Sequence, residues 1–294
     1  MKLIIQPDDG VSPVVKAIRK ARKSLDVVIF RFDRPEVEKA LAGAVERAVN
    51  VRALIAHTNK GGEKTLRKLE LRLLDAGLTV SRTADDLPRY HGKMMIIDGV
   101  LHIYGFNFTK LDIDKSRSFG IVTPDKRLVQ EASRLFEADF NRQPYTPTCA
   151  RFVVSPENSR TVLTNFIRGA KRELLIYDEQ VSDNLVQRAL AERAGAGVDI
   201  RVIGSIEKLI PGIRVVSLAD LRLHVRAIVR DGAEAFVGSQ SLRRLELDGR
   251  REVGIVITDA RLARRIQSVF EADWTASGGK KARADGEKAQ RKAS

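Results

Sequence analysis

The chain has 294 residues, of which 43% are hydrophobic, and it carries a formal net charge of +14. This length and composition allow a substantial core, and the positive charge favours anionic partners such as nucleic acid, anionic lipid head groups or a phosphate-bearing substrate. The single cysteine, Cys149, excludes an internal disulfide and a cysteine-rich metal site. Because no apolar run approaches the ~20 residues of a membrane span and the apolar N-terminal stretch is too short for a secretory signal, we expect a cytoplasmic protein, with peripheral membrane contact as an option.

Helix-type and strand-type periodicities alternate through the first half of the chain. Ser12 and Pro13 predict a helix start, with Ser as the N-cap and Pro at the first helical position. Residues 35–49 and the leucine-striped segment 66–74 predict two more helices, and Gly77 can end the second. Buried strands are predicted at 25–30, 51–56, 93–98, 100–104 and 119–123, followed by a helix from about 125 to 140. This alternation predicts an α/β fold with mixed sheets flanked by helices.

The same patterns then begin again. The run SPVVKAIRKARKSLDVVIF (12–30) resembles the run that starts SPENSRTVL at Ser155, and FEADF (136–140) matches FEADW (270–274). His91 and His224 are 133 positions apart and the FEAD runs 134 apart, which indicates an internal duplication. We therefore predict a first repeat over 1–143, a proline-containing junction at 141–153, a second repeat over 150–274 and a disordered basic tail over 275–294.

The first repeat contains a motif suited to phosphate chemistry. His91 and Lys93 are separated by one glycine, and four apolar residues then lead to Asp98-Gly99, a good hairpin turn. Alternation along a strand puts His91 and Lys93 on one face, where an imidazole can attack phosphorus or move a proton and an ammonium can hold phosphate oxygens. Asn107, in the run Gly105-Phe106-Asn107, can donate its amide to the same phosphate.

The second repeat contains the matching motif. His224-Val-Arg226 leads to Asp231-Gly232 and then to Gly-Ser-Gln-Ser at 238–241. Arginine also clamps phosphate and can do so with two hydrogen bonds, although it is not equivalent to lysine. Two matching motifs at one place in a repeat favour a functional pair over ordinary strand histidines, whereas His57 and His102 have no repeated counterpart and are expected to be structural. Gly61-Gly62 predicts a helix start rather than a phosphate loop, since no GK[ST] follows.

These paired segments resemble the H-x-K-x4-D motifs, each followed by a G-S-x-N-like turn, of the phospholipase D superfamily. The resemblance covers nearly the whole chain before the tail. It implies a pseudo-twofold fold with one active site at the repeat interface, a covalent phosphohistidine, and neither a metal nor another cofactor. In that family His91 would be the nucleophile and His224 the acid. The resemblance assigns catalytic roles to His91, Lys93, Asp98, His224, Arg226 and Asp231, with support from Asn107, Ser239, Gln240 and Glu252.

The motifs also depart from the family pattern. Arg226 replaces the usual lysine, Gln240 stands where asparagine is usual, and Phe106 replaces a serine. Glu252 lies 28 residues after His224, where the family often places the carboxylate that orients a histidine, and Phe119 occupies that offset in the first repeat. The two histidines are therefore expected to be inequivalent, and the sequence does not fix which one Glu252 serves.

Three functions remain open at this point. The resemblance favours a phospholipase D or transphosphatidylase similar to cardiolipin synthases, acting on a phospholipid and held near anionic lipid by its basic surface. The net charge also suits a metal-independent nuclease. The departures at Arg226 and Gln240 would suit an inactive phosphate binder. Because one chain carries both motifs, a monomer is sufficient for one site.

Overall fold

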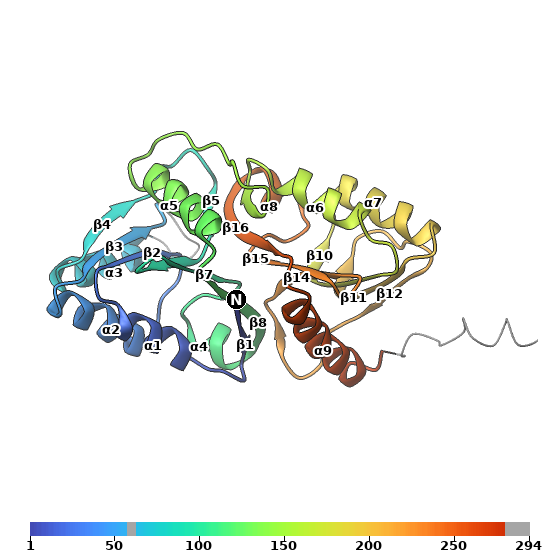
Figure 1. The fold of residues 1–294 in the computed structure, drawn as a ribbon, viewed down its shortest axis with the longest axis horizontal. Coiled ribbons are helices and arrows are strands. Elements are labelled where there is room, and N and C mark those ends of the chain that lie inside the picture. Colours follow the sequence, from blue (N-terminus) through green and yellow to red (C-terminus); the bar gives the residue numbers. More distant parts are fainter. Residues whose placement is uncertain (58–62, 280–294) are drawn as a thin grey trace, which may run out of the picture.

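The computed structural model describes residues 1–57 and 63–279. The helices and strands alternate in both halves of the chain (Figure 1). Those of the first half are β1 (Lys2–Gln6), α1 (Ser12–Lys20), β2 (Ser24–Ile29), α2 (Pro35–Glu46), β3 (Asn50–Ile55), α3 (Glu63–Asp75), β4 (Thr79–Arg82), β5 (Arg89–Tyr90), β6 (Met94–Ile97), β7 (Val100–Tyr104), α4 (Lys110–Asp114), β8 (Ser116–Thr123) and α5 (Lys126–Phe140). Those of the second half are β9 (Phe152–Ser155), α6 (Ser159–Arg168), β10 (Glu173–Val181), α7 (Asn184–Gly195), β11 (Asp199–Ile206), β12 (Ile213–Val216), β13 (Arg222–Leu223), β14 (Arg226–Arg230), β15 (Glu234–Gly238), α8 (Arg244–Asp248), β16 (Arg250–Ile257) and α9 (Ala260–Ala276).

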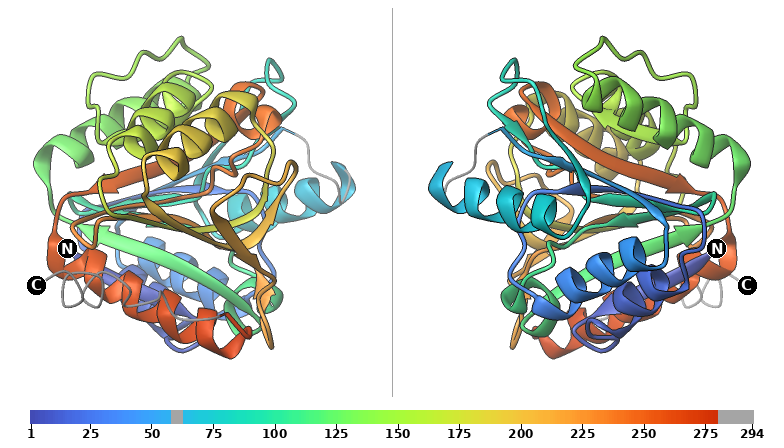
Figure 2. Two further views of the ribbon diagram at one scale, coloured as in Figure 1. Left: turned by 90° about the vertical axis from the view of Figure 1, so that its right-hand side faces the viewer. Right: turned by 90° about the vertical axis from the view of Figure 1, so that its left-hand side faces the viewer.

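The strands form two mixed sheets with the same internal order. The first sheet runs β1-β8-β7-β6-β2-β3-β4, and the second runs β12-β11-β10-β14-β15-β16, with β9 beside β16 in the position that β1 takes beside β8. Strands β2, β3 and β4 are parallel to one another, as are β10, β11 and β12. The remaining pairs within each repeat are antiparallel. The two sheets share the middle layer of the molecule, with helices above and below it (Figure 2). The predicted α/β class with two similar repeats is confirmed.

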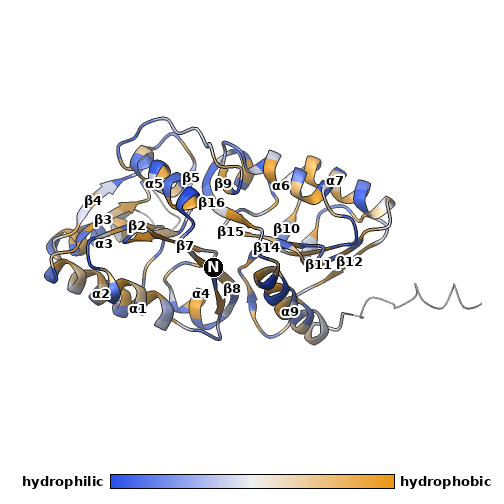
Figure 3. Ribbon diagram, in the orientation of Figure 1, coloured by the Kyte–Doolittle hydropathy of each residue, from blue (hydrophilic) through white to orange (hydrophobic). Residues whose placement is uncertain are grey.

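The helices bury apolar faces against the sheets. One core packs α1, α2 and α3 against the first sheet, and another packs α6 and α7 against the second. A third core joins the two sheets and includes the apolar faces of α5 and α9. Hydrophobic residues accordingly concentrate in the central strands, whereas the helices carry polar residues on their outer sides (Figure 3). The joined core fixes the two repeats against each other.

Several sequence predictions need adjustment at their ends. The first helix begins at Ser12 itself, preceded by Val11, and no side chain caps it. Gly77 ends the third helix as predicted, with a φ of 83° and its amide donating to the Leu74 carbonyl. The expected tail begins too early at 275, because α9 continues to Ala276. The rest of that tail from 280 onward, and Gly61-Gly62, lie outside the described residues.

Each repeat also lends a short strand to the sheet of the other. β5 pairs in parallel with β16, and the amide of His91 then donates to the Arg251 carbonyl at 2.7 Å. β13 pairs in parallel with β8, and the amide of His224 donates to the Arg117 carbonyl at 3.3 Å. Each motif histidine is therefore attached to the last long strand of the opposite repeat.

The FEAD runs hold these same strands in place. Asp139 of the first run accepts from Arg251 at 3.1 Å, and Asp273 of the second accepts from Arg117 at 2.8 Å. All four side chains are buried. Buried, hydrogen-bonded pairs of this kind are costly to break, so they fix the register in which β8 and β16 meet the histidines.

Candidate active site

His91 is bound on both ring nitrogens. Its Nδ1 lies 2.9 and 3.0 Å from the two carboxylate oxygens of Glu252, which comes from β16 of the other repeat. Its Nε2 lies 3.0 Å from the Nζ of Lys93. These partners assign the ring proton to Nδ1, since a carboxylate accepts and an ammonium donates. Nε2 therefore keeps a lone pair. Burial, with Lys93 next, holds the pKa of His91 well below its ordinary value of 6.5, so the imidazole is neutral at pH 7.

Lys93 is a buried cation beside the histidine. Its Nζ donates to the His91 carbonyl oxygen at 2.6 Å and lies 5.7 Å from the centre of the Phe30 ring. Burial lowers the pKa of Lys93 from 10.5 to about 7, and the attraction of Glu252 and Asp112 only partly opposes this shift. Lys93 is therefore close to its titration midpoint at neutral pH. A bound phosphate would favour the ammonium form.

His224 faces a second carboxylate. Its Nδ1 lies 3.5 Å from Oδ2 of Asp112, an electrostatic contact that is too long for a strong hydrogen bond. Asp112 also accepts from the Asn107 amide nitrogen Nδ2 at 2.5 Å and from Arg222 at 2.7 Å. Burial holds the pKa of His224 well below its ordinary value, and Asp112 acts in the opposite direction. Sequence reasoning missed Asp112, which no H-x-K spacing identifies.

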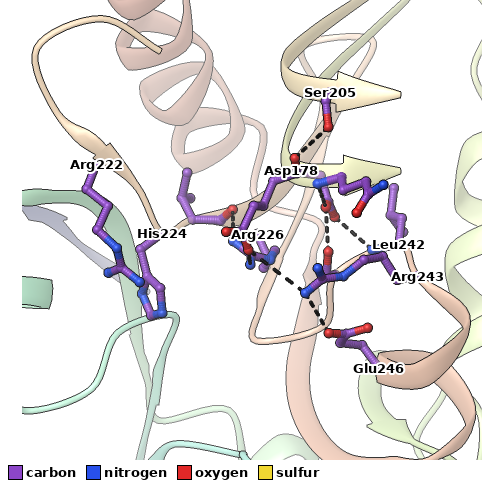
Figure 4. Close-up of polar contacts among 12 residues, drawn as sticks. Asp178, Ser205, Arg222, His224, Arg226, Leu242, Arg243 and Glu246 are labelled. Atoms are coloured by element: carbon purple, nitrogen blue, oxygen red, sulfur yellow. Dashed lines mark hydrogen bonds and ion pairs between the residues drawn. The ribbon is translucent and has the colours of Figure 1, made fainter. Parts of the chain in front are cut away.

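Arg226 stands where the first repeat has Lys93, but its surroundings differ. It donates to Glu179 at 2.9 Å and to the Val225 carbonyl at 3.0 Å. Figure 4 shows Arg226 near His224 and close to Arg243, which in turn reaches Glu246. The strand register places Glu179 of β10 at the position of Phe30, the residue after β2, because Tyr177 pairs with Ala227 as Val28 pairs with Met94. The second motif's cation thus has a counter-ion where the first has an aromatic ring.

The supporting residues fall into two groups. Ser239 lines the same cavity as the histidines, and its hydroxyl exchanges hydrogen bonds with the backbone of Val253. Asn107 also lines it, and its second amide hydrogen remains available for a phosphate. Gln240 does not line it, because its side chain is buried and donates to the Val153 carbonyl at 2.9 Å. The support expected from Gln240 is therefore corrected to a structural contact.

Asp98 and Asp231 also lie away from the histidines. Asp98 follows the far end of β6, about 16 Å along the strand from Lys93. Its carboxylate accepts from the backbone amides of Arg22, Lys23 and Ser24 at 2.7–3.0 Å. Asp231 makes the same kind of contacts with the backbone at 171–173. The expectation that these two residues are catalytic is corrected: their carboxylates close a turn, as their φ values of 48° and 55° indicate.

The two histidines differ because the first repeat has no carboxylate at the position that corresponds to Glu252. Ala233 lengthens the hairpin turn of the second repeat, so the offset between repeats changes from 133 to 134 after it. The counterpart of Glu252 is therefore Ser118, not Phe119. The Ser118 hydroxyl is buried and has no hydrogen-bond partner within the described residues. Asp112, from another position, supplies the carboxylate that faces His224.

Both histidines open into a cavity of about 650 Å³ between the repeats. Seven arginines and five carboxylates line it, together with apolar side chains that include Phe32, Leu66 and Leu111. Within residues 1–57 and 63–279, no group of three or more His, Cys, Asp or Glu side chains is arranged to hold a metal ion. None of the helices in this part of the chain is long and apolar enough to cross a bilayer.

A family model described as "Cardiolipin synthase, PLD-like domain" matches residues 14–140 and 163–274. The chain belongs to this family. The resemblance read from the paired motifs is thereby confirmed, and with it the assignment to the phospholipase D superfamily of phosphoryl-transfer enzymes.

The curated relatives include proteins with two different names. A polyphosphate kinase of Vibrio vulnificus (strain YJ016) is 25% identical over 308 residues, covering 93% of this chain and 44% of that protein. The mitochondrial cardiolipin hydrolase of Homo sapiens is 30% identical over 146 residues, covering 48% of this chain and 54% of that protein. The chain thus spans about half the length of these relatives or less.

Solved structures share the fold. Polyphosphate kinase from Porphyromonas gingivalis superimposes with a TM-score of 0.76 at 20% identity, over 92% of this chain and 50% of that one. Phosphatidylserine synthase from Haemophilus influenzae superimposes with a TM-score of 0.69 at 10% identity, over 94% of this chain and 86% of that one. At these identities the likeness concerns the fold alone.

Proposed function

We propose that this protein transfers a phosphoryl group through a covalent intermediate on His91, with His224 as the proton donor and acceptor. The observation that carries the proposal is the state of His91. Glu252 holds its Nδ1–H, its pKa is lowered so that the ring is neutral, and its Nε2 points to the cation of Lys93. A neutral imidazole with one fixed tautomer is the form that can attack phosphorus.

The proposed reaction has two steps. The Nε2 lone pair of His91 attacks phosphorus, the bond from phosphorus to the leaving oxygen breaks, and that oxygen takes a proton from His224. An acceptor, either water or an alcohol, then loses its proton to His224 and attacks phosphorus, and the bond to His91 breaks. Lys93 and Arg226 stabilise the charge on the non-bridging oxygens.

His224 must carry a proton in the first step. Burial lowers the pKa of His224 and favours its neutral form, but a bound phosphate adds negative charge next to that of Asp112. Both charges favour the imidazolium, so substrate binding itself loads the acid. Glu252 lies closer to His91 than Asp112 does to His224, and both of its carboxylate oxygens are within hydrogen-bond distance of Nδ1. This difference supports His91, rather than His224, as the nucleophile.

For the substrate, we propose a phospholipid phosphodiester first. Three observations support it: the description of the matching family, the human cardiolipin hydrolase relative, and the apolar side chains of Phe32, Leu66 and Leu111 in the lining of the cavity. Contact with an anionic membrane belongs to this proposal and is testable by co-sedimentation with vesicles.

Polyphosphate is the second candidate. The match to a polyphosphate kinase covers 93% of the chain, whereas the match to the cardiolipin hydrolase covers 48%. The guanidinium-rich lining also suits a chain of linked phosphates. Nucleic acid is the third candidate, and the net positive charge of the chain is the observation that supports it.

An assay of the purified protein in EDTA tests the reaction and the substrate together. Separate tubes contain anionic phospholipid vesicles with glycerol, polyphosphate, and mixed single- and double-stranded DNA, each with a His91→Ala control. Headgroup release or exchange that is lost in the control supports the phospholipid proposal. Consumption of polyphosphate or of DNA that is lost in the control would instead identify that molecule as the substrate. Silence in all three tubes would favour an inactive phosphate binder.

A further inference from the structure

Two arginines that the proposed chemistry does not use lie beside His91. The guanidinium carbons of Arg89 and Arg31 are 5.0 and 5.8 Å from the centre of the Phe30 ring. The same ring meets the His91 imidazole edge-on, with 4.6 Å between the ring centres. Arg89 and His91 are therefore neighbours of the same phenyl ring. All four side chains line the active-site cavity.

The cations on the two sides of the cavity are compensated differently. On the His224 side, Arg226 has Glu179 at 2.9 Å and Arg243 has Glu246 at 2.6 Å. On the His91 side, no carboxylate within residues 1–57 and 63–279 forms an ion pair with Arg31 or Arg89. Arg31 and Arg89 therefore lack the close ion pairs that Arg226 and Arg243 have.

The neighbours of Arg89 include a further arginine. Arg250 lies opposite Arg89 in the ladder between β16 and β5, lines the same cavity, and shares its carboxylate, Glu246, with Arg243. Burial lowers the pKa of Arg89 below its ordinary value, Arg250 and Arg31 lower it further, and Glu252 and Glu246 act in the opposite direction. Partly buried like charges oppose one another, and an anion bound between them would relieve this repulsion.

We infer that Arg31 and Arg89, assisted by Arg250, form a second phosphate subsite next to His91, so that the preferred substrate carries another phosphate close to the one that is attacked. This inference rests on the proposed function, since it takes His91 as the point of attack. Because Arg89 and His91 lie against the same phenyl ring, two neighbouring phosphates of a single molecule can reach both of them. A chain of linked phosphates and a lipid with two phosphates share this chemistry.

Binding measurements test the subsite without requiring turnover. Isothermal titration calorimetry in EDTA at constant ionic strength compares inorganic phosphate with pyrophosphate. We expect pyrophosphate to bind at least ~10-fold more tightly to the unchanged protein, because it adds charge-assisted hydrogen bonds. Arg89→Gln and Arg31→Gln should each weaken pyrophosphate binding by about 10-fold and change phosphate binding by less than about 2-fold.

Arg243→Gln is the matched control. It removes one guanidinium from the same cavity, but from the compensated side. We expect it to weaken the binding of phosphate and pyrophosphate by similar factors. Equal binding of the two ligands to the unchanged protein, or an equal loss of both in Arg89→Gln, would overturn the second subsite.

Turnover then distinguishes the source of the second phosphate. Tripolyphosphate, cardiolipin vesicles and the single-phosphate diester bis(p-nitrophenyl) phosphate are offered to the unchanged protein and to Arg89→Gln. Selective loss with tripolyphosphate identifies a phosphate chain, and selective loss with cardiolipin identifies a lipid; a loss of the same size with the single-phosphate diester contradicts the subsite. If the pyrophosphate contrast holds but no phosphohistidine forms, the proposed reaction fails while the subsite stands.

Discussion

The buried Lys93 makes anion binding depend on pH in a defined direction. Burial lowers its pKa to about 7, so the ammonium is lost as the pH rises through 7. A tetrahedral dianion needs that ammonium beside His91. Anion affinity should therefore be highest below pH 7 and should fall above it. The pKa values of His91 and His224 are well below 6.5, so these histidines contribute little to the change in anion affinity between pH 6 and pH 8.

The size of the effect follows from the value of that pKa. Between pH 6 and pH 8 the protonated fraction of Lys93 falls from about ten elevenths to about one eleventh, so affinity should fall about 10-fold, or about 1.4 kcal/mol. Sulfate is the ligand to use, because its charge is constant over this range. Calorimetry at pH 6, 7 and 8 gives the dissociation constants, and buffers of different ionisation enthalpy report the proton taken up on binding above pH 7.

Lys93→Arg is the control that isolates this group. A guanidinium stays charged throughout the range, as the natural arginine of the second motif does, so sulfate affinity in this variant should not change between pH 6 and pH 8. A flat profile in the unchanged protein would refute the reasoning. So would an identical slope in Lys93→Arg, which would assign the titration to another group.

Three further variants test other parts of the site. Glu252→Gln should reduce turnover about 10³-fold with the fold retained by circular dichroism, because an amide can stabilise the wrong imidazole tautomer; unchanged turnover would remove the orienting role. Asp98→Ala should lower the free energy of unfolding in urea by about 1–3 kcal/mol and keep kcat, since its carboxylate holds backbone amides; a lost kcat in folded protein would restore it to catalysis. Glu179→Gln should lower the KM about 3- to 10-fold by freeing the second-motif cation, whereas Asp33→Asn, which removes one charge from the same cavity, should change it less; equal effects would mean that only total charge matters.

The strands and helices could be predicted because their signals are local. The segment 25–30 is apolar enough to be a buried strand in any context, and the leucine stripe at 66–74 has the period of a helix. The duplication was also visible, since the FEAD runs and the histidines recur at nearly one offset. What the FEAD runs do was not visible, because each aspartate pairs with an arginine on a strand of the other repeat.

The partners of the two histidines could not be predicted for the same reason. Glu252 reaches His91 across 161 positions, and only the pairing of β5 with β16 brings them together. Asp112 belongs to a short helix after the first motif, and only the pairing of β13 with β8 brings His224 to it. The hairpin turn of the second repeat is also one residue longer than that of the first. Counting from the histidines therefore aligns Glu252 with Phe119, whereas the strands align it with Ser118.

The resemblance to the family motif assigns catalytic roles to Asp98 and Asp231 that their hydrogen bonds do not support. The aspartate of each motif has the spacing of the family pattern, yet its carboxylate binds three backbone amides at a turn. Sequence spacing identifies the position of such a residue but not the direction of its side chain. The hydrogen bonds of Asp98 and Asp231 supply that direction.

The central claim is that His91 becomes covalently phosphorylated, and trapping the intermediate tests it most directly. The variant His224→Ala is mixed in EDTA with bis(p-nitrophenyl) phosphate, whose leaving group needs no proton, and the protein is examined by intact mass and peptide mapping. Because the first step needs no acid and the second lacks its base, we predict that a phosphoryl adduct accumulates on His91 with release of one nitrophenolate. Release of nitrophenolate without an adduct, or an adduct on His224 of the unchanged protein, would contradict the assignment of His91 as the nucleophile.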